Sequence, residues 1–175
     1  ETVYGLGADA SSQQALQRLY ATKGRPSQHP VIVHLGDPSW LDQWAVSTPS
    51  AGILARTFLP GPLTMILPRK PGGQDTVGVR VPSHPLALEL LRKFGRALVA
   101  PSANRFGRVS PTTAEHVMEE FAPEEARVLD GGPCSVGVES TIVDLSGEHP
   151  VVLRPGEITP SMIFQALGQA DPMAR

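Results

Sequence analysis

The chain has 175 residues, of which 41% are apolar and 18% charged, and its formal net charge at pH 7 is -2. This length suits one domain with a substantial hydrophobic core, and the composition excludes a chain that is disordered throughout. The weak negative charge argues against a dedicated nucleic-acid binder, because such domains carry a strong basic excess, although a local basic patch is compatible with it.

Helical periodicity recurs along the chain, and residue types typical of caps mark the helix ends. Residues 10–22 carry Leu16 and Leu19 at helical spacing, with Ser11 expected as the N-cap and Gly24 just past the end. Further helices are predicted at 39–58 with an interruption near Pro49, at 85–94 before Gly95, at 112–121 from a Thr112/Glu115 capping box, and at 160–167 between Thr159 and Gly168.

Short β-branched runs bounded by Gly or Pro predict strands at residues 31–35, 63–67, 77–81, 97–100, 127–129, 141–145 and 151–153. Strands and helices interleave irregularly, which predicts an α/β or α+β fold with a mixed sheet rather than a βαβ repeat. The breaks at residues 71–73 and 101–111 are short enough to be loops inside one fold. Since no Walker P-loop or dinucleotide glycine fingerprint is present, a nucleotide has to be held in another way.

Cys134 is the one cysteine, so neither an intrachain disulfide nor a cysteine zinc cluster is expected. We interpret Cys134 as an incidental small residue, because no neighbouring base or cation supports a nucleophile. The sequence shows no signal peptide and no apolar run of the roughly 20 residues that cross a bilayer. A cytoplasmic protein without membrane contact is therefore expected.

Two cations flank a glycine at Lys23-Gly24-Arg25, between the first predicted helix and an apolar strand. They are either partners of the helix dipole or a clamp for a polyphosphate, which Arg25 can bind bidentately. His29 and His34 follow at a spacing that suits neither a helix nor a strand metal site, so we expect no metal there.

On the predicted strand 77–81 and the residue before it, Thr76, Gly78 and Arg80 share one face, while the other face is valine. This polar face is either the solvent side or the floor of a ligand site. In the second case Gly78 leaves room for the ligand and Arg80 offers a fork to a carboxylate.

Further polar residues follow the ends of strands. Ser102 and Asn104 come after strand 97–100, and Ser110 precedes a predicted helix, where anions are favoured. These groups suit a ribose or a phosphate, although the same residues are common in turns. A glycine-rich loop leads into Ser140, and Arg154 ends an apolar strand. Together with Lys23, Arg25 and Arg80, this pattern indicates charge neutralisation and positioning of a phosphorylated ligand, as in nucleotidyl transfer.

The sequence resembles the YrdC/Sua5 family of threonylcarbamoyl-AMP synthases in motifs that occur in the family's order over nearly the whole chain. The Lys23, Arg25, Ser102 and Asn104 set is similar to the family signature K-x-R…S-x-N. The stretches that carry the resemblance are Glu1-Thr2-Val3-Tyr4-Gly5-Leu6-Gly7, Lys23-Gly24-Arg25-Pro26, Val31-Ile32-Val33-His34, Pro60-Gly61-Pro62-Leu63-Thr64, Val79-Arg80-Val81-Pro82, Pro101-Ser102-Ala103-Asn104, Ser110-Pro111-Thr112, Glu139-Ser140-Thr141 and Leu153-Arg154-Pro155-Gly156.

The resemblance implies a twisted, mostly mixed sheet flanked by helices around a concave positive cavity. It implies an L-threonine pocket lined by Thr2, His34, Arg80, Ala100 and Ser140, and an ATP site surrounded by Lys23, Arg25, His29, Thr76, Ser102, Asn104, Ser110 and Arg154, with Lys23 and Arg25 catalytic. The family commonly has asparagine where this chain has His29, and a neutral imidazole can still donate one hydrogen bond to ATP.

The chemistry that the resemblance implies joins ATP, L-threonine and bicarbonate and releases pyrophosphate, with Mg²⁺ accompanying ATP and no organic cofactor. The product would pass to a partner complex that loads it onto tRNA, as the first step of N6-threonylcarbamoyladenosine formation at position 37. Residues 1–168 would form the catalytic domain, lacking the strand and Pro-Thr that usually precede Glu1, and residues 169–175 a tail or the start of a linker. The residues of the Lys23-Gly24-Arg25-Pro26 and Val31-Ile32-Val33-His34 motifs are more similar to those of the longer, two-domain members of the family.

Two alternatives remain open at this point. One is the carbamoyl-adenylate domain of another carbamoyltransferase, which uses carbamoyl phosphate and is therefore separated by threonine dependence. The other is a non-catalytic module that binds double-stranded RNA or tRNA, against which the net charge of -2 and the lack of an aromatic stacking motif argue.

Overall fold

The computed structural model describes residues 1–70 and 76–170. The predicted loop at residues 71–73 and the last five residues of the predicted 169–175 tail lie outside the described residues. None of the helices in these two ranges is long and apolar enough to cross a membrane.

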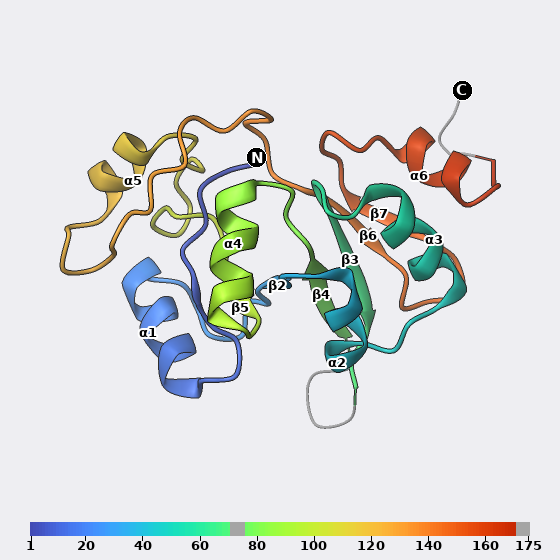
Figure 1. Cartoon of the computed structure of the whole chain (residues 1–175), viewed down its shortest axis with the longest axis horizontal. Coiled ribbons are helices and arrows are strands. Elements are labelled where there is room, and N and C mark those ends of the chain that lie inside the picture. The colour runs from blue at the N-terminus through green and yellow to red at the C-terminus, as the bar shows by residue number, and fades with distance from the viewer. Residues whose placement is uncertain (71–75, 171–175) are drawn as a thin grey trace.

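Seven strands in the described part of the chain form one sheet in the order β1-β5-β2-β4-β3-β6-β7 (Figure 1). The strands are β1 (Ala8–Asp9), β2 (Val33–His34), β3 (Leu63–Pro68), β4 (Thr76–Arg80), β5 (Leu98–Val99), β6 (Thr141–Asp144) and β7 (Val151–Arg154). The pairs β2/β4 and β3/β6 are parallel and the other pairs are antiparallel. The mixed sheet predicted from the irregular order of elements is confirmed.

The helices are α1 (Gln13–Lys23), η1 (Pro38–Trp40), α2 (Leu41–Trp44), α3 (Pro49–Phe58), α4 (Pro85–Phe94), α5 (Ala114–Glu120) and α6 (Pro160–Ala166). Pro49 begins α3 rather than only interrupting it, because Thr48 caps the helix and proline is tolerated in its first turn. Gly95 ends α4 in the left-handed conformation at φ 71°, as predicted.

Two N-caps differ from their predicted positions. The cap of α1 is Ser12, whose side chain accepts a hydrogen bond from the Ala15 N–H, while Ser11 bonds to Asp9 instead. The cap of α5 is Thr113, so the predicted capping box at Thr112 does not form. Neighbouring hydroxyl residues have equal capping propensity, and the path of the preceding chain decides between them.

The strand predicted at residues 127–129 is wrong, because no strand is formed there. Val128 packs instead against a small apolar cluster beside α5. The strand β1 has no counterpart among the predicted strands. It consists of two residues that pair with β5, which is too short for an alternating pattern to be visible.

Alternate residues of the central strands point to opposite faces of the sheet. Leu63, Met65, Val79 and Val143 have no exposed surface and form the core, together with apolar residues of α2, α3 and α6. The residues between them face a cavity of about 1390 Å³, whose lining includes Thr64, Ile66, Thr76, Gly78, Arg80, Ile142 and Arg154. The polar face of β4 therefore belongs to a cavity floor and not to the open solvent side of the sheet.

Candidate functional site

Three groups of polar residues converge on this cavity from different parts of the chain. The Arg80 cluster contains Glu1, Thr2, His34 and Arg80; the Arg154 cluster contains Thr64, Ser110, Glu139, Ser140 and Arg154; and the Lys23 cluster contains Lys23, Arg25, Ser102 and Asn104. All three have members that line the cavity.

Arg80 is the centre of its cluster and is only 5% exposed. Its Nε donates to the carbonyl of Gly61 at 3.1 Å, Nη1 to the Thr2 hydroxyl at 2.9 Å, and Nη2 to the Glu1 carboxylate at 2.5 Å. Burial alone would raise the pKa of Glu1, but the Arg80 charge and the Ser83 N–H hold it below its ordinary value. These bonds use one N–H of each terminal nitrogen of Arg80 and leave the second one available.

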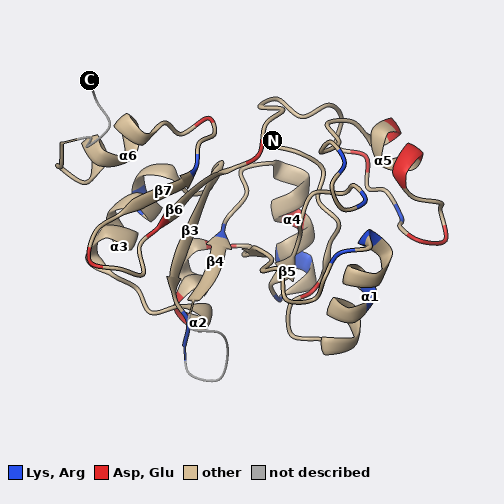
Figure 2. Cartoon of the chain, turned by 180° about the vertical axis from the view of Figure 1, so that it is seen from behind, with Lys and Arg blue, Asp and Glu red and all other residues tan. Residues whose placement is uncertain are grey.

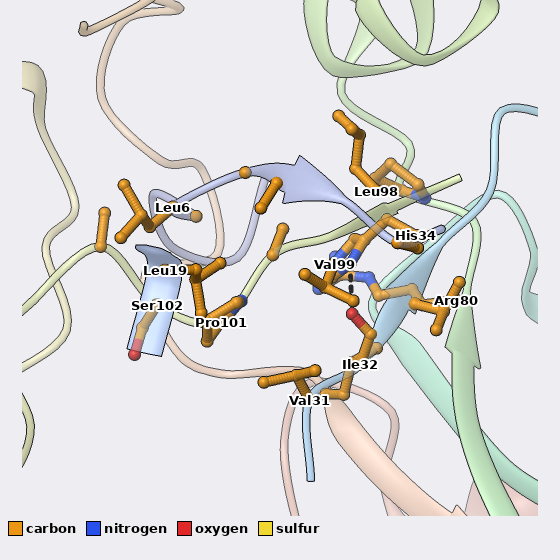
Figure 3. A pocket seen from close by; sticks show the side chains of 18 of the residues that line it. Leu6, Leu19, Val31, Ile32, His34, Arg80, Leu98, Val99, Pro101 and Ser102 are labelled. Atoms are coloured by element: carbon orange, nitrogen blue, oxygen red, sulfur yellow. Dashed lines mark hydrogen bonds between the residues drawn. The ribbon is translucent and has the colours of Figure 1, made fainter. Parts of the chain in front are cut away.

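His34 lies beside Arg80 because the parallel register of β2 and β4 pairs these two residues (Figure 3). Burial and the Arg80 charge lower the pKa of His34 to about 4, so the imidazole is neutral at pH 7. Its Nδ1 lies 3.2 Å from the Ile32 carbonyl. Because a carbonyl can only accept, Nδ1 carries the proton and Nε2 is left as an acceptor.

The Arg154 cluster joins β3 and β7 to the residue that precedes β6. The hydroxyls of Thr64 and Ser140, both buried, are 2.8 Å apart, and Arg154 donates to the Ser140 hydroxyl at 3.0 Å and to its carbonyl at 2.9 Å. The turn after β7 fixes this arrangement. A Cβ at Gly156 would lie 2.7 Å from both the Glu139 carbonyl and the Thr141 nitrogen, so only glycine fits there.

Lys23 is the last residue of α1 and is 2% exposed. Its ammonium donates to the carbonyls of Ser102 and Asn104, and it thereby ties the loop after β5 to the end of α1. Burial and the Arg25 charge lower the pKa of Lys23 to about 8, although the Glu139 and Glu120 carboxylates oppose this shift. Figure 2 shows the basic segments at the end of α1 and in the loop before α5, near the acidic residues of α5.

Arg25 and Asn104 each leave a buried polar atom without a partner. Arg25 donates from Nη2 to the Pro30 carbonyl at 2.8 Å, but its Nε has no acceptor. Asn104 donates from Nδ2 to the carbonyls of Arg105 and Arg108, but its Oδ1 has no donor. Within residues 1–70 and 76–170 these are the buried side-chain atoms left unsatisfied. Arg25 lines the cavity and Asn104 lies behind its wall, so both atoms are candidates for contact with a ligand or an ordered water.

The structure places most of the predicted site residues around one space. Those that line the cavity are Thr2, Arg25, His34, Thr76, Arg80, Ala100, Ser102, Ser140 and Arg154. Lys23, Asn104 and Ser110 stand behind this wall and contact it through hydrogen bonds. His29 lies further out, where its ring packs edge-on against Phe106 with 5.3 Å between the ring centroids.

Sequence reasoning missed three polar residues of the site: Glu1, Thr64 and Glu139. Each belongs to a stretch that carries the family resemblance, but single carboxylates and a strand threonine gave no chemical signal by themselves. Cys134 also lines the cavity, and burial raises the pKa of its thiol.

A family model for Sua5, YciO and YrdC proteins, described as telomere recombination, matches residues 1–156. The chain is 46% identical to the threonylcarbamoyl-AMP synthase of Bacillus subtilis, over 96% of this chain and 51% of that protein. It is 44% identical to the threonylcarbamoyl-AMP synthase of Pyrococcus abyssi, over 97% of this chain and 52% of that protein. The crystal structure of P. abyssi Sua5 complexed with L-threonine matches with a TM-score of 0.92 at 44% identity, over 97% of this chain and 52% of that one. The chain thus spans about half the length of these relatives.

Proposed function

The chain belongs to the Sua5/YciO/YrdC family, and on that premise we propose that it forms L-threonylcarbamoyl-AMP and pyrophosphate from L-threonine, bicarbonate and ATP. The observation that carries the proposal is that one cavity contains both a cluster suited to an amino acid and clusters suited to phosphate. The Arg80 cluster supplies a guanidinium beside a neutral hydrogen-bond acceptor. The Lys23 and Arg154 clusters supply cations, and the Lys23 cluster also holds two unsatisfied polar atoms.

L-Threonine would bind at the Arg80 cluster. The free N–H groups of Arg80 are suited to a carboxylate, because charge-assisted hydrogen bonds to a guanidinium are strong and directional. Nε2 of neutral His34 would accept a hydrogen bond from the hydroxyl or the amine of the substrate. Thr2, Ala100 and Ser140 would complete the pocket, and all three line the cavity.

ATP would bind where the Lys23 and Arg154 clusters meet. Lys23 has one N–H left after its two loop contacts, and the Arg25 side chain has an unused Nε–H. Arg154 would complete the set of cations around the phosphates. His29, Thr76, Ser102, Asn104 and Ser110 are proposed to surround the rest of ATP, with Mg²⁺ entering as part of the Mg-ATP substrate.

In the proposed reaction bicarbonate takes up a proton and loses water to give CO2. The threonine ammonium loses a proton to become the amine, and the amine adds to CO2 and releases a second proton, giving an N-carboxylate. An oxygen of this carboxylate attacks the α-phosphorus of ATP, the bond to the β-phosphate oxygen breaks, and pyrophosphate leaves with the bonding electrons. The chain contributes positioning and charge neutralisation, and no general base is assigned. The product would be handed to a tRNA-modifying partner in the cytoplasm, as the first step of N6-threonylcarbamoyladenosine formation at position 37.

The test is pyrophosphate release from Mg-ATP with and without L-threonine and bicarbonate. We expect release that needs both co-substrates and that falls on the order of 100-fold or more in Lys23→Ala and in Arg25→Ala. The second variant is needed because Lys23→Ala also frees the 102–104 loop. Near-normal turnover in both variants, or release driven by carbamoyl phosphate in place of threonine and bicarbonate, would contradict the proposal.

A further inference from the structure

The Arg154 cluster contains a carboxylate in a place where the proposed function expects phosphate. Glu139 Oε1 accepts a hydrogen bond from the Ser110 hydroxyl at 2.6 Å, and Oε2 lies 3.5 Å from Arg154 Nη1. Ser110 and Arg154 are both proposed ATP contacts. We infer that the Glu139 carboxylate occupies the phosphate position in the ligand-free protein, competes with the anion for Ser110 and Arg154, and leaves when phosphate binds. The inference rests on the proposed function, which it deepens by naming the residue that limits phosphate affinity.

The field of this carboxylate extends to the second cationic cluster. Glu139 raises the pKa of Lys23, against the larger effects of burial and of Arg25. The Glu139 carboxylate thus contacts Arg154 and also acts electrostatically on Lys23, and both are cations that a polyphosphate would use. It therefore lowers the positive potential available to a bound anion.

Stability gives little reason for the carboxylate to be there. Arg154 is already held by two hydrogen bonds to Ser140, and the 3.5 Å contact to Glu139 is longer than a charge-assisted hydrogen bond. The side chains of Glu139 and Arg154 are about one-third exposed, and ion pairs of this kind contribute little to folding. The hydrogen bond from Ser110 at 2.6 Å needs an oxygen acceptor, which a neutral amide would also supply, so folding does not require the negative charge. The placement of the charge is thus better explained by binding than by folding.

The local structure lets the side chain move while the backbone stays fixed. The Glu139 carbonyl is packed closely against the turn at Gly156, where even a Cβ would not fit. The side chain, by contrast, is 35% exposed and lines the cavity, so it can rotate into solvent. Rotation would free Ser110 and Arg154 for the ligand, and its reversal would favour release of a bound pyrophosphate.

The experiment is calorimetric titration of the wild-type chain and of Glu139→Gln with Mg-free pyrophosphate at pH 7. This substitution keeps the shape of the side chain and its hydrogen bond to Ser110 but removes the charge. We expect pyrophosphate to bind roughly tenfold more tightly to Glu139→Gln, because a negative charge a few ångströms from the ligand is lost. The matched control is Glu120→Gln. The Glu120 carboxylate also raises the pKa of Lys23, but it bonds to Arg105 and Arg108 rather than to Ser110 or Arg154.

The inference predicts a change of less than about threefold in the Glu120→Gln control, because only the general field is altered there. Equal or weaker binding to Glu139→Gln than to wild type would overturn it, as would equal tightening in both variants. Binding of pyrophosphate that is equal in wild type and Glu139→Gln, yet lost in Arg25→Ala, would overturn the inference alone. Absence of binding to every variant would also remove the proposed phosphate site. A readout without any substitution is the ¹³C carboxyl resonance of Glu139 in the wild-type chain, which has to shift on pyrophosphate addition and would refute the inference by staying in place.

Discussion

Replacing Arg80 with methionine should destabilise the fold strongly, because it leaves the Glu1 carboxylate buried without its partner. The Arg80 and Glu1 side chains are 6% and 10% exposed, and Arg80 also donates hydrogen bonds to the Thr2 hydroxyl and the Gly61 carbonyl. Breaking a buried ion pair from one side costs about 3–5 kcal/mol. Glu1 keeps the Ser83 N–H and can take up a proton, so we expect the lower end, about 3 kcal/mol.

The assay is urea unfolding at pH 7, followed by the fluorescence of Trp40 and Trp44, which pack against the core. The free energy of unfolding of the double variant Glu1→Gln/Arg80→Met should be about 1–2 kcal/mol higher than that of Arg80→Met, since burying a neutral amide costs less free energy than burying an unpaired charge.

The way in which the Glu1 carboxyl makes stability depend on pH should also change sign between the wild type and Arg80→Met. In the wild type the pKa of Glu1 is lowered, so the carboxylate contributes stability above its ordinary pKa, and this is lost as the pH falls. In Arg80→Met, burial dominates and raises the pKa of Glu1, so acidification should stabilise this variant relative to wild type. A loss below about 1 kcal/mol, or a double variant no more stable than Arg80→Met, would refute the reasoning.

Two further predictions concern Lys23 and Gly156. The pKa of Lys23 in the folded state is about 8, below its ordinary value of 10.5, so the free energy of unfolding should rise as the pH increases from 8 to 10.5. The affinity for pyrophosphate should fall above pH 8, where Lys23 loses its charge, and Lys23→Arg should abolish this fall. A calorimetric pH profile of Lys23→Arg that equals the wild-type profile would contradict this prediction. Gly156→Ala should cost about 1–3 kcal/mol in urea unfolding, because its Cβ would overlap the backbone at Glu139 and Thr141. Gly147→Ala, where a Cβ meets no atom within 4 Å, is the matched control, and an equal effect of both substitutions would rule out the steric explanation.

Features fixed by neighbouring residues were predictable. The helix predicted at residues 85–94 is confirmed as α4 with Gly95 at its end, because apolar spacing and a left-handed cap are local properties. The mixed sheet followed from the order of the elements, and the membership of the family followed from motifs spread over the chain. The roles proposed for the individual residues of the site in binding L-threonine and ATP are still predictions.

Features that depend on contacts distant in the sequence were decided by the tertiary structure. The polar face of β4 was open to two interpretations from the sequence, and in the folded sheet β4 lies between β2 and β3 with this face on the floor of the cavity. The strand expected at residues 127–129 does not form, and Val128 packs beside α5 instead. The carboxylate partner of Arg80, Glu1, lies 79 residues away along the chain, and the partner of Ser110, Glu139, lies 29 residues away. A sequence pattern records the periodicity of a segment, but the free energy of burying a charge depends on which group the fold brings beside it, and that is a property of the assembled chain.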